Sequence, residues 1–213
     1  MSAPLNYPVP LAVEDFVPVL LTTCGVLLLH RRGPGYRIVV AAALIGAGGF
    51  AKATAKLIAA AGGPDLPWLR GMLFPLLTCG FALLYLTLTR DSARIAHRVA
   101  AAAVIAASAL VAILARSPLP MLVSATVFAT LTGFRLIGLA RRAGDTTTAV
   151  LFGIQLVSFF VLGPLGSRPD QTVALQWTEQ LCNTAAQAAF LVAARRSAQP
   201  ARRYSGSSST ALQ

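Results

Sequence analysis

Two lysines lie inside a long apolar stretch of the chain, where charged side chains are rare. Lys52 and Lys56 are four residues apart, so a helix places both on one face. Charged groups at membrane depth are energetically costly, and they usually face the protein interior or a water-filled cavity. Two ammonium groups on such a face favour a ligand that carries an anionic group.

The last apolar stretch of the chain, about residues 173–194, carries matching polar groups. Four of them recur at helical spacing and form a stripe: Gln176, Gln180, Asn183 and Gln187. Glu179 flanks this stripe. Amides make a poor surface against lipid, which offers them no hydrogen bonds. We therefore expect this helix to turn its stripe towards the inside of a bundle.

Glu179 falls at the same membrane depth as the two lysines. With a rise of 1.5 Å per residue, Lys52 and Lys56 lie roughly 4 and 10 Å outward of the midplane, and Glu179 lies roughly 6 Å outward. This matching depth predicts an ion pair between Glu179 and one of the lysines.

Further polar residues fall on the same outer side or near the midplane: Glu14, Asp15, Arg70 and Gln155. Together with the lysines and the stripe, they predict one polar cavity between the helices of about residues 38–61 and 173–194. We expect this cavity to open to the outside and to bind or transport a small anionic or zwitterionic solute, or a lipid. Arg70 adds a third cation to the two lysines.

Several other interpretations fit the same residues. A buried lysine–carboxylate pair can fix two helices together and bind nothing, and Lys56 can snorkel alone to the membrane surface. The chain can also be a non-catalytic accessory or scaffold subunit of a membrane complex, with a membrane-protein partner or a second copy of itself. A sensor that signals through a partner is a further alternative.

The sequence contains few of the residue patterns that are typical of enzymes or of cofactor-binding proteins. The motifs HExxH and GxSxG are absent, and the two histidines, His30 and His97, fall at the inner ends of helices. The three cysteines, Cys24, Cys79 and Cys182, lie within apolar segments and are typical of small core residues. We expect no metal, haem or other cofactor.

The composition places these residues in a membrane protein. Of 213 residues, 56% are hydrophobic and 12% charged, whereas soluble domains carry about 25% charged residues. The net charge of +11 would suggest nucleic acid as a partner of a soluble domain. Here the basic residues form short runs between apolar stretches, so the expected partner is the lipid bilayer and not nucleic acid.

Apolar stretches of about 20 residues predict an all-α membrane protein, a seven-transmembrane-helix bundle that forms one membrane domain over residues 1–196. The expected helices are about residues 11–30, 38–61, 69–89, 97–115, 120–140, 147–165 and 173–194. Residues 197–213 are rich in Ser, Arg and Ala and are expected to be a disordered cytoplasmic tail. Gly46, Gly48 and Gly49 predict close packing of the second helix.

The basic residues predict the orientation of this bundle. One set of ends and loops holds 12 of the 18: Arg31, Arg32, Arg37, Arg90, Arg94, Arg98, Arg141, Arg142, Arg195, Arg196, Arg202 and Arg203. The opposite set holds 3: Arg70, Arg116 and Arg168. Because basic loops stay in the cytoplasm, we expect the N-terminus outside, the C-terminus in the cytoplasm, and a multi-pass protein of the cell (plasma) membrane.

This layout resembles that of the microbial rhodopsins, and Asn183 and Gln187 have the spacing of that family's aspartate and retinal-binding lysine in the last helix. No lysine follows Lys56, however, so a retinal Schiff base at that place is excluded. The layout is also similar to that of small sugar transporters with three-plus-one-plus-three helices, but their Pro-Gln motif is absent.

Overall fold

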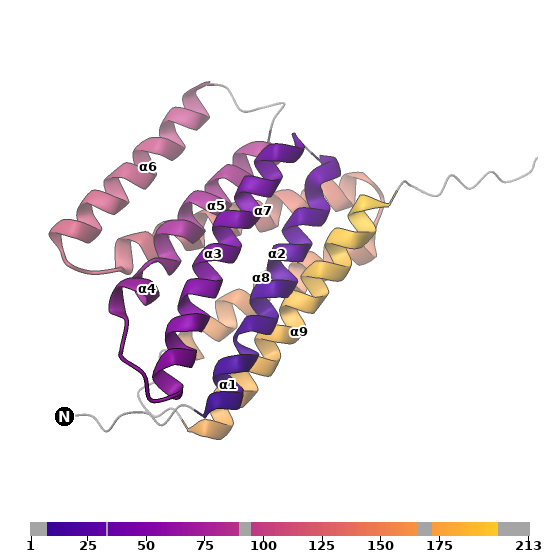
Figure 1. The fold of residues 1–213 in the computed structure, drawn as a ribbon. Coiled ribbons are helices and arrows are strands. Elements are labelled where there is room, and N and C mark those ends of the chain that lie inside the picture. Colours follow the sequence, from indigo (N-terminus) through magenta and orange to yellow (C-terminus); the bar gives the residue numbers. More distant parts are fainter. Residues whose placement is uncertain (1–7, 33, 90–94, 166–171, 200–213) are drawn as a thin grey trace, which may run out of the picture.

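The computed structural model describes residues 8–32, 34–89, 95–165 and 172–199, and within these ranges the chain is helical and contains no strand. The all-α fold is therefore confirmed. The first helical segment consists of α1 (Val9–Glu14), α2 (Phe16–Leu28) and the 3₁₀ turn η1 (Leu29–Arg32). The others are α3 (Gly35–Ala60), α4 (Pro67–Gly71) with α5 (Leu73–Leu88), α6 (Ile95–Leu114), α7 (Leu119–Arg142), α8 (Thr146–Leu165) and α9 (Val173–Ala198) (Figure 1).

Five of these segments are long and apolar enough to cross a membrane, judged by length and composition: Val9–Arg32, Gly35–Ala60, Pro67–Leu88, Ile95–Leu114 and Leu119–Arg142. The apolar run of α8, Thr146–Leu162, is shorter. Helix α9 has the length but carries the polar stripe predicted from the sequence. The chain is thus compatible with a helical membrane bundle.

Six of the segments close into a ring, and α6 lies outside it. Helix α2 packs on α3 and α9, α3 on α5, α5 on α7, α7 on α8, and α8 on α9. Helix α6 packs mainly on α7 and α5 and projects from the bundle (Figure 1). Only 6% of its apolar window is buried, compared with 28–44% for the other four long apolar segments.

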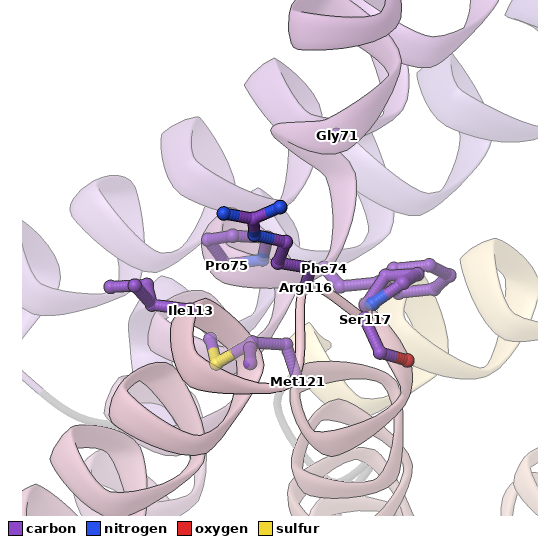
Figure 2. Close-up of a pocket in the computed structure, with 9 residues that line it drawn as sticks. Gly71, Phe74, Pro75, Ile113, Arg116, Ser117 and Met121 are labelled. Atoms are coloured by element: carbon purple, nitrogen blue, oxygen red, sulfur yellow. The ribbon is translucent and has the colours of Figure 1, made fainter.

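Prolines divide the first and third segments near one end. Pro18 and Pro75 have no N–H, so they cannot bond the carbonyls of Glu14 and Gly71 four residues earlier, and their rings crowd those carbonyls. The helix breaks at that point in both segments, after Glu14 and after Gly71. Figure 2 shows Gly71 and Pro75 on adjoining parts of the third segment. The break after Glu14 places Asp15 between α1 and α2.

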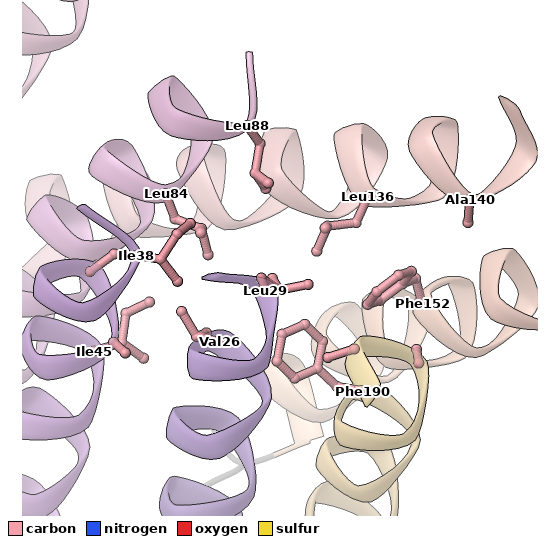
Figure 3. Close-up of a cluster of buried hydrophobic side chains, with 14 of the residues drawn as sticks. Val26, Leu29, Ile38, Ile45, Leu84, Leu88, Leu136, Ala140, Phe152 and Phe190 are labelled. Atoms are coloured by element: carbon pink, nitrogen blue, oxygen red, sulfur yellow. The ribbon is translucent and has the colours of Figure 1, made fainter. Parts of the chain in front are cut away.

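The apolar core gathers at the end of the bundle where η1 lies. Its larger side chains come from α2, η1, α3, α5, α7, α8 and α9: Val26, Leu29, Ile38, Ile45, Leu84, Leu136, Phe152 and Phe190 (Figure 3). The rings of Phe152 and Phe190 are tilted at 57° with centroids 5.8 Å apart. Because both ends of the chain contribute, this core joins α2 and α9 and closes the ring.

The glycines of α3 allow neighbouring helices to approach closely, as predicted. A Cβ added at Gly46 would lie 2.8 Å from Thr23 Oγ1, and one at Gly49 would lie 2.7 Å from Val19 Cγ2. A Cβ at Gly48 would lie 3.0 Å from the Leu73 carbonyl oxygen. Because α3 runs unbroken through these positions, the glycines serve packing and not a local break.

Arginines bind carbonyl groups at the C-terminal ends of helices. Arg31 donates to the Ala198 carbonyl at 3.0 Å, Arg32 donates to the Ser197 carbonyl at 3.0 Å, and Arg135 donates to the Leu88 carbonyl at 3.1 Å. Such bonds satisfy carbonyls that have no partner within the helix. Ser197 and Ala198, predicted to belong to the tail, are part of α9, and residues 200–213 of that tail lie outside the described residues.

Asp145 caps the N-terminus of α8. One carboxylate oxygen accepts the Thr148 backbone N–H at 2.9 Å, and the other accepts the Thr148 hydroxyl at 2.6 Å. Arg196 from α9 lies 3.4 Å from the same carboxylate. The hydrogen bonds from Thr148, and then Arg196, hold the pKa of Asp145 below its usual value. The cap therefore joins α8 to α9.

Replacing Asp145 by alanine should lower the free energy of unfolding by about 1 kcal/mol, the typical cost of a lost aspartate cap. Because the pKa is lowered on folding, the carboxylate stabilises the folded protein fully above about pH 4, and this contribution is lost as the pH falls through the lower folded pKa. Thermal unfolding in detergent from pH 7 to pH 3 measures both effects. Asp65→Ala is the control, since its ion pair with Arg70 is exposed. Equal losses for the two variants would contradict the role of the cap.

Candidate functional site

Asp15, at the break between α1 and α2, meets a lysine from α3. The Lys56 ammonium nitrogen lies 2.6 Å from Asp15 Oδ2, and the two side chains are 28% and 12% exposed. Charges at this depth in an apolar helix are retained when they are paired or reach water. Asp15 is the single residue between α1 and α2, and its ion pair joins this junction to α3.

Lys52 lies one helical turn before Lys56 and joins the same group of charges. It is close enough to Asp15 for attraction and to Lys56 for repulsion. Its side chain is exposed at the surface of the bundle, and no described carboxylate forms an ion pair with it. Two ammonium groups on α3 therefore share the field of Asp15.

Glu14 faces the opposite neighbour, α9. Its Oε1 accepts the Thr184 hydroxyl at 2.8 Å. Glu14 and Asp15 are adjacent in the chain, and through them the break contacts both α9 and α3. We call Glu14, Asp15, Lys52 and Lys56 the ionic cluster.

The polar stripe of α9 continues from this cluster along α2. Gln187 Oε1 accepts the Thr22 hydroxyl at 2.9 Å, and Gln187 Nε2 donates to Asn183 Oδ1 at 3.4 Å. The Gln180 amide nitrogen is buried and has no hydrogen-bond partner among the described residues. Gln176, Gln180, Asn183 and Gln187 are all half-buried, so none of them is fully exposed at the bundle surface.

The lysine-bearing helix and α9 are linked through the first segment. Helix α2 packs on both α3 and α9, and α1 contacts both as well. The polar residues therefore meet at two interfaces, α1–α3 and α1/α2–α9. In the structure, Lys56 forms an ion pair with Asp15. Glu179 is half-buried on α9, and its pairing with a lysine stays a prediction.

Of the two other residues predicted for the cavity, the structure places Arg70 in a separate ion pair and Gln155 on a helix that packs on α9. Arg70, on α4, forms an exposed ion pair with Asp65, with 2.5 Å between Arg70 Nη2 and Asp65 Oδ1. Gln155 is half-buried on α8, which packs on α7 and α9. Two hollows of about 270 and 490 Å³ are lined by none of the predicted site residues.

In comparisons with known proteins, no protein-family model, curated protein or solved structure matches this chain. The fold and the site therefore define its class by themselves. It is a helical bundle with five apolar helices long enough to span a membrane, and an ion pair lies at a proline-induced break in the first of them.

Proposed function

We propose that this protein is a multi-pass protein of the cell membrane that binds or transports a small anionic or zwitterionic solute at the ionic cluster. The observation that carries the proposal is the Asp15–Lys56 pair with Lys52 beside it. Two lysines and two carboxylates in otherwise apolar helices resemble the charged groups that mark solute pathways in membranes. A solute carboxylate would bind Lys52 and compete with Asp15 for Lys56.

The surroundings of the cluster support a zwitterionic solute in particular. Glu14 faces α9 and offers an acceptor for an ammonium group on the side away from the lysines. The buried Gln180 amide supplies a donor without a partner among the described residues.

The proposal includes a seven-helix bundle with its N-terminus outside and its C-terminus in the cytoplasm. The unequal distribution of 12 and 3 arginines between the two sides supports this orientation. The ionic cluster then lies in the outer half of the membrane and is reached from outside. The polar stripe of α9 is consistent with a seventh span, because α2 covers part of its polar face.

A thermal-shift screen of the purified protein with amino acids and small carboxylic acids tests the proposed site. Any compound that raises the melting temperature should lose this effect in Lys52→Met, because an ammonium group that faces the solute is removed. Arg70→Gln serves as the control, since Arg70 is paired with Asp65 outside the cluster. Equal shifts in both variants and in the unmodified protein would reject the ionic cluster as the site.

A second candidate function, an accessory subunit, is supported by α6. This helix is strongly apolar and only 6% buried, so most of its surface is free to contact a membrane partner. A photocrosslinker at Leu110, which is 57% exposed on α6, should then yield one protein adduct of defined mass in native membranes. The control position is Val157 on α8, which is 63% exposed. Lipid adducts alone at both positions would contradict this alternative.

A further inference from the structure

Three helices of this protein end in the same hydrogen-bonded motif. At the ends of α3, α7 and α6, the N–H of one residue bonds the carbonyl five residues earlier: Gly63 to Ile58, Asp145 to Ala140, and Ser117 to Ala112. The residue before each donor adopts a positive φ. It is Gly62 (φ 79°) in α3 and Gly144 (φ 73°) in α7, but Arg116 (φ 48°) in α6.

An arginine is an unusual choice at this position. The left-handed conformation is easy for glycine and strained for a residue with a Cβ, which is why glycine usually follows a helix that ends in this way. The other two helices follow that preference. Strain of this kind persists at sites where the side chain has a function, so the Arg116 side chain itself needs an explanation.

Arg116 lies at the mouth of an apolar pocket between the ends of α5, α6 and α7. The pocket has a volume of about 270 Å³, and Arg116 is its only charged lining residue among those described. Figure 2 shows the guanidinium above Pro75, with Ile113 and Met121 on one wall and Ser117 on the other side. Gly71 and Phe74 also line the pocket.

The charge of Arg116 is available to a ligand. Its side chain is exposed, and no residue in the described part of the chain pairs with it. The nearby Arg70, by contrast, is bound to Asp65. Because Arg116 follows the 20-residue apolar helix α6, it lies at the level of lipid headgroups whichever way the protein faces.

We propose that this pocket is a binding site for one anionic phospholipid of the surrounding bilayer. The lipid phosphate binds the Arg116 guanidinium and the Ser117 hydroxyl, and an acyl chain lies against Phe74, Ile113 and Met121. The chain fills the space between the ring of helices and α6, which has few protein contacts of its own. This site is separate from the ionic cluster and does not depend on the solute proposed for it.

Native mass spectrometry of protein extracted from bilayers of equal phosphatidylglycerol and phosphatidylcholine tests the proposal. The unmodified protein should retain one phosphatidylglycerol. In Arg116→Gln the retained fraction should fall about tenfold, as expected for a lost charge-assisted hydrogen bond. Arg116→Gly should lose the lipid to the same extent but melt at a higher temperature in phosphatidylcholine, because glycine accepts the positive φ.

Two further measurements distinguish binding of the lipid headgroup from binding of its acyl chain. Gly71→Leu adds a side chain to the pocket wall at a position where a Cβ meets nothing within 4 Å, and it should reduce lipid retention with Arg116 intact. Inorganic phosphate alone should not raise the melting temperature. Full retention in Arg116→Gln would overturn the site, as would an equal loss in Arg70→Gln, which would indicate unspecific binding of surrounding lipids only.

Discussion

Asp15→Asn should lower the free energy of unfolding by about 2 kcal/mol, because the ion pair is half-buried and its loss falls between the cost for an exposed pair and that for a buried pair. Asp15 is only 12% exposed, its carboxylate is paired with Lys56, and it also attracts the charge of Lys52. Its loss leaves two neighbouring ammonium groups that repel each other. Unfolding in mixed micelles with increasing denaturing detergent measures the effect.

Lys56→Met is the matched comparison and should cost less than Asp15→Asn. Removing Lys56 leaves Asp15 beside Lys52, which can move towards the carboxylate, since it already lies close enough to attract it. The double variant Asp15→Leu with Lys56→Met should recover part of the loss, because neither an unpaired Lys56 ammonium nor an unpaired carboxylate then remains at this position. A larger loss for Lys56→Met than for Asp15→Asn would contradict this arrangement of charges.

Gly80→Ala should cost about 1–3 kcal/mol through overpacking between α3 and α5. A Cβ at Gly80 would lie 2.6 Å from Ile45 Cγ1 and 3.2 Å from both the Ala41 carbonyl oxygen and the Ile45 nitrogen. Ile45 is only 3% exposed, and the other two contacts are backbone atoms. The two helices must therefore move apart to accept one methyl group.

Gly138→Ala provides the control, since a Cβ at this position of α7 meets nothing within 4 Å. Alanine favours a helix over glycine by up to about 1 kcal/mol, so this variant should be as stable as the unmodified protein or more so. The same unfolding measurement compares the two variants. A Gly80→Ala protein as stable as Gly138→Ala would show that α3 and α5 are not in close contact at this point.

Part of the fold follows directly from the sequence. The helices coincide with apolar runs because a chain in lipid must satisfy its backbone hydrogen bonds internally. Gly46, Gly48 and Gly49 pack closely because small residues allow helices to approach. Lys52 and Lys56 share one side of α3 because helical geometry determines the direction of residues four apart.

The partner of Lys56 could not be chosen in the same way. Depth along a helix follows from residue number, but the direction of a side chain around the bundle depends on the order of the helices. The structure places Asp15 against Lys56, because α1 and α2 pack on α3, while a pairing of Glu179 with a lysine stays a prediction. The available signal was Pro18, which breaks the helix where Asp15 lies.

The ion pair of Arg70 with Asp65 could not be predicted from the sequence for a similar reason. Its depth along the third segment predicted that Arg70 lines the cavity. Arg70 lies on the short helix α4, which is separate from α5, and it forms an ion pair with Asp65 in the preceding loop. The positive φ of Arg116 could not be predicted either, since the sequence around it contains no glycine to mark the end of α6.

The most direct test of the proposed site is whether water-soluble reagents reach the ionic cluster from outside the cell. Lys52→Cys, made in a protein whose Cys24, Cys79 and Cys182 are replaced by alanine, is treated in intact cells with a membrane-impermeant thiol reagent. We predict rapid labelling, while the control Leu110→Cys on the exposed face of α6 stays unlabelled. Labelling of Lys52→Cys only in opened cells would reverse the proposed orientation. No labelling in either preparation would contradict a solute site at the ionic cluster.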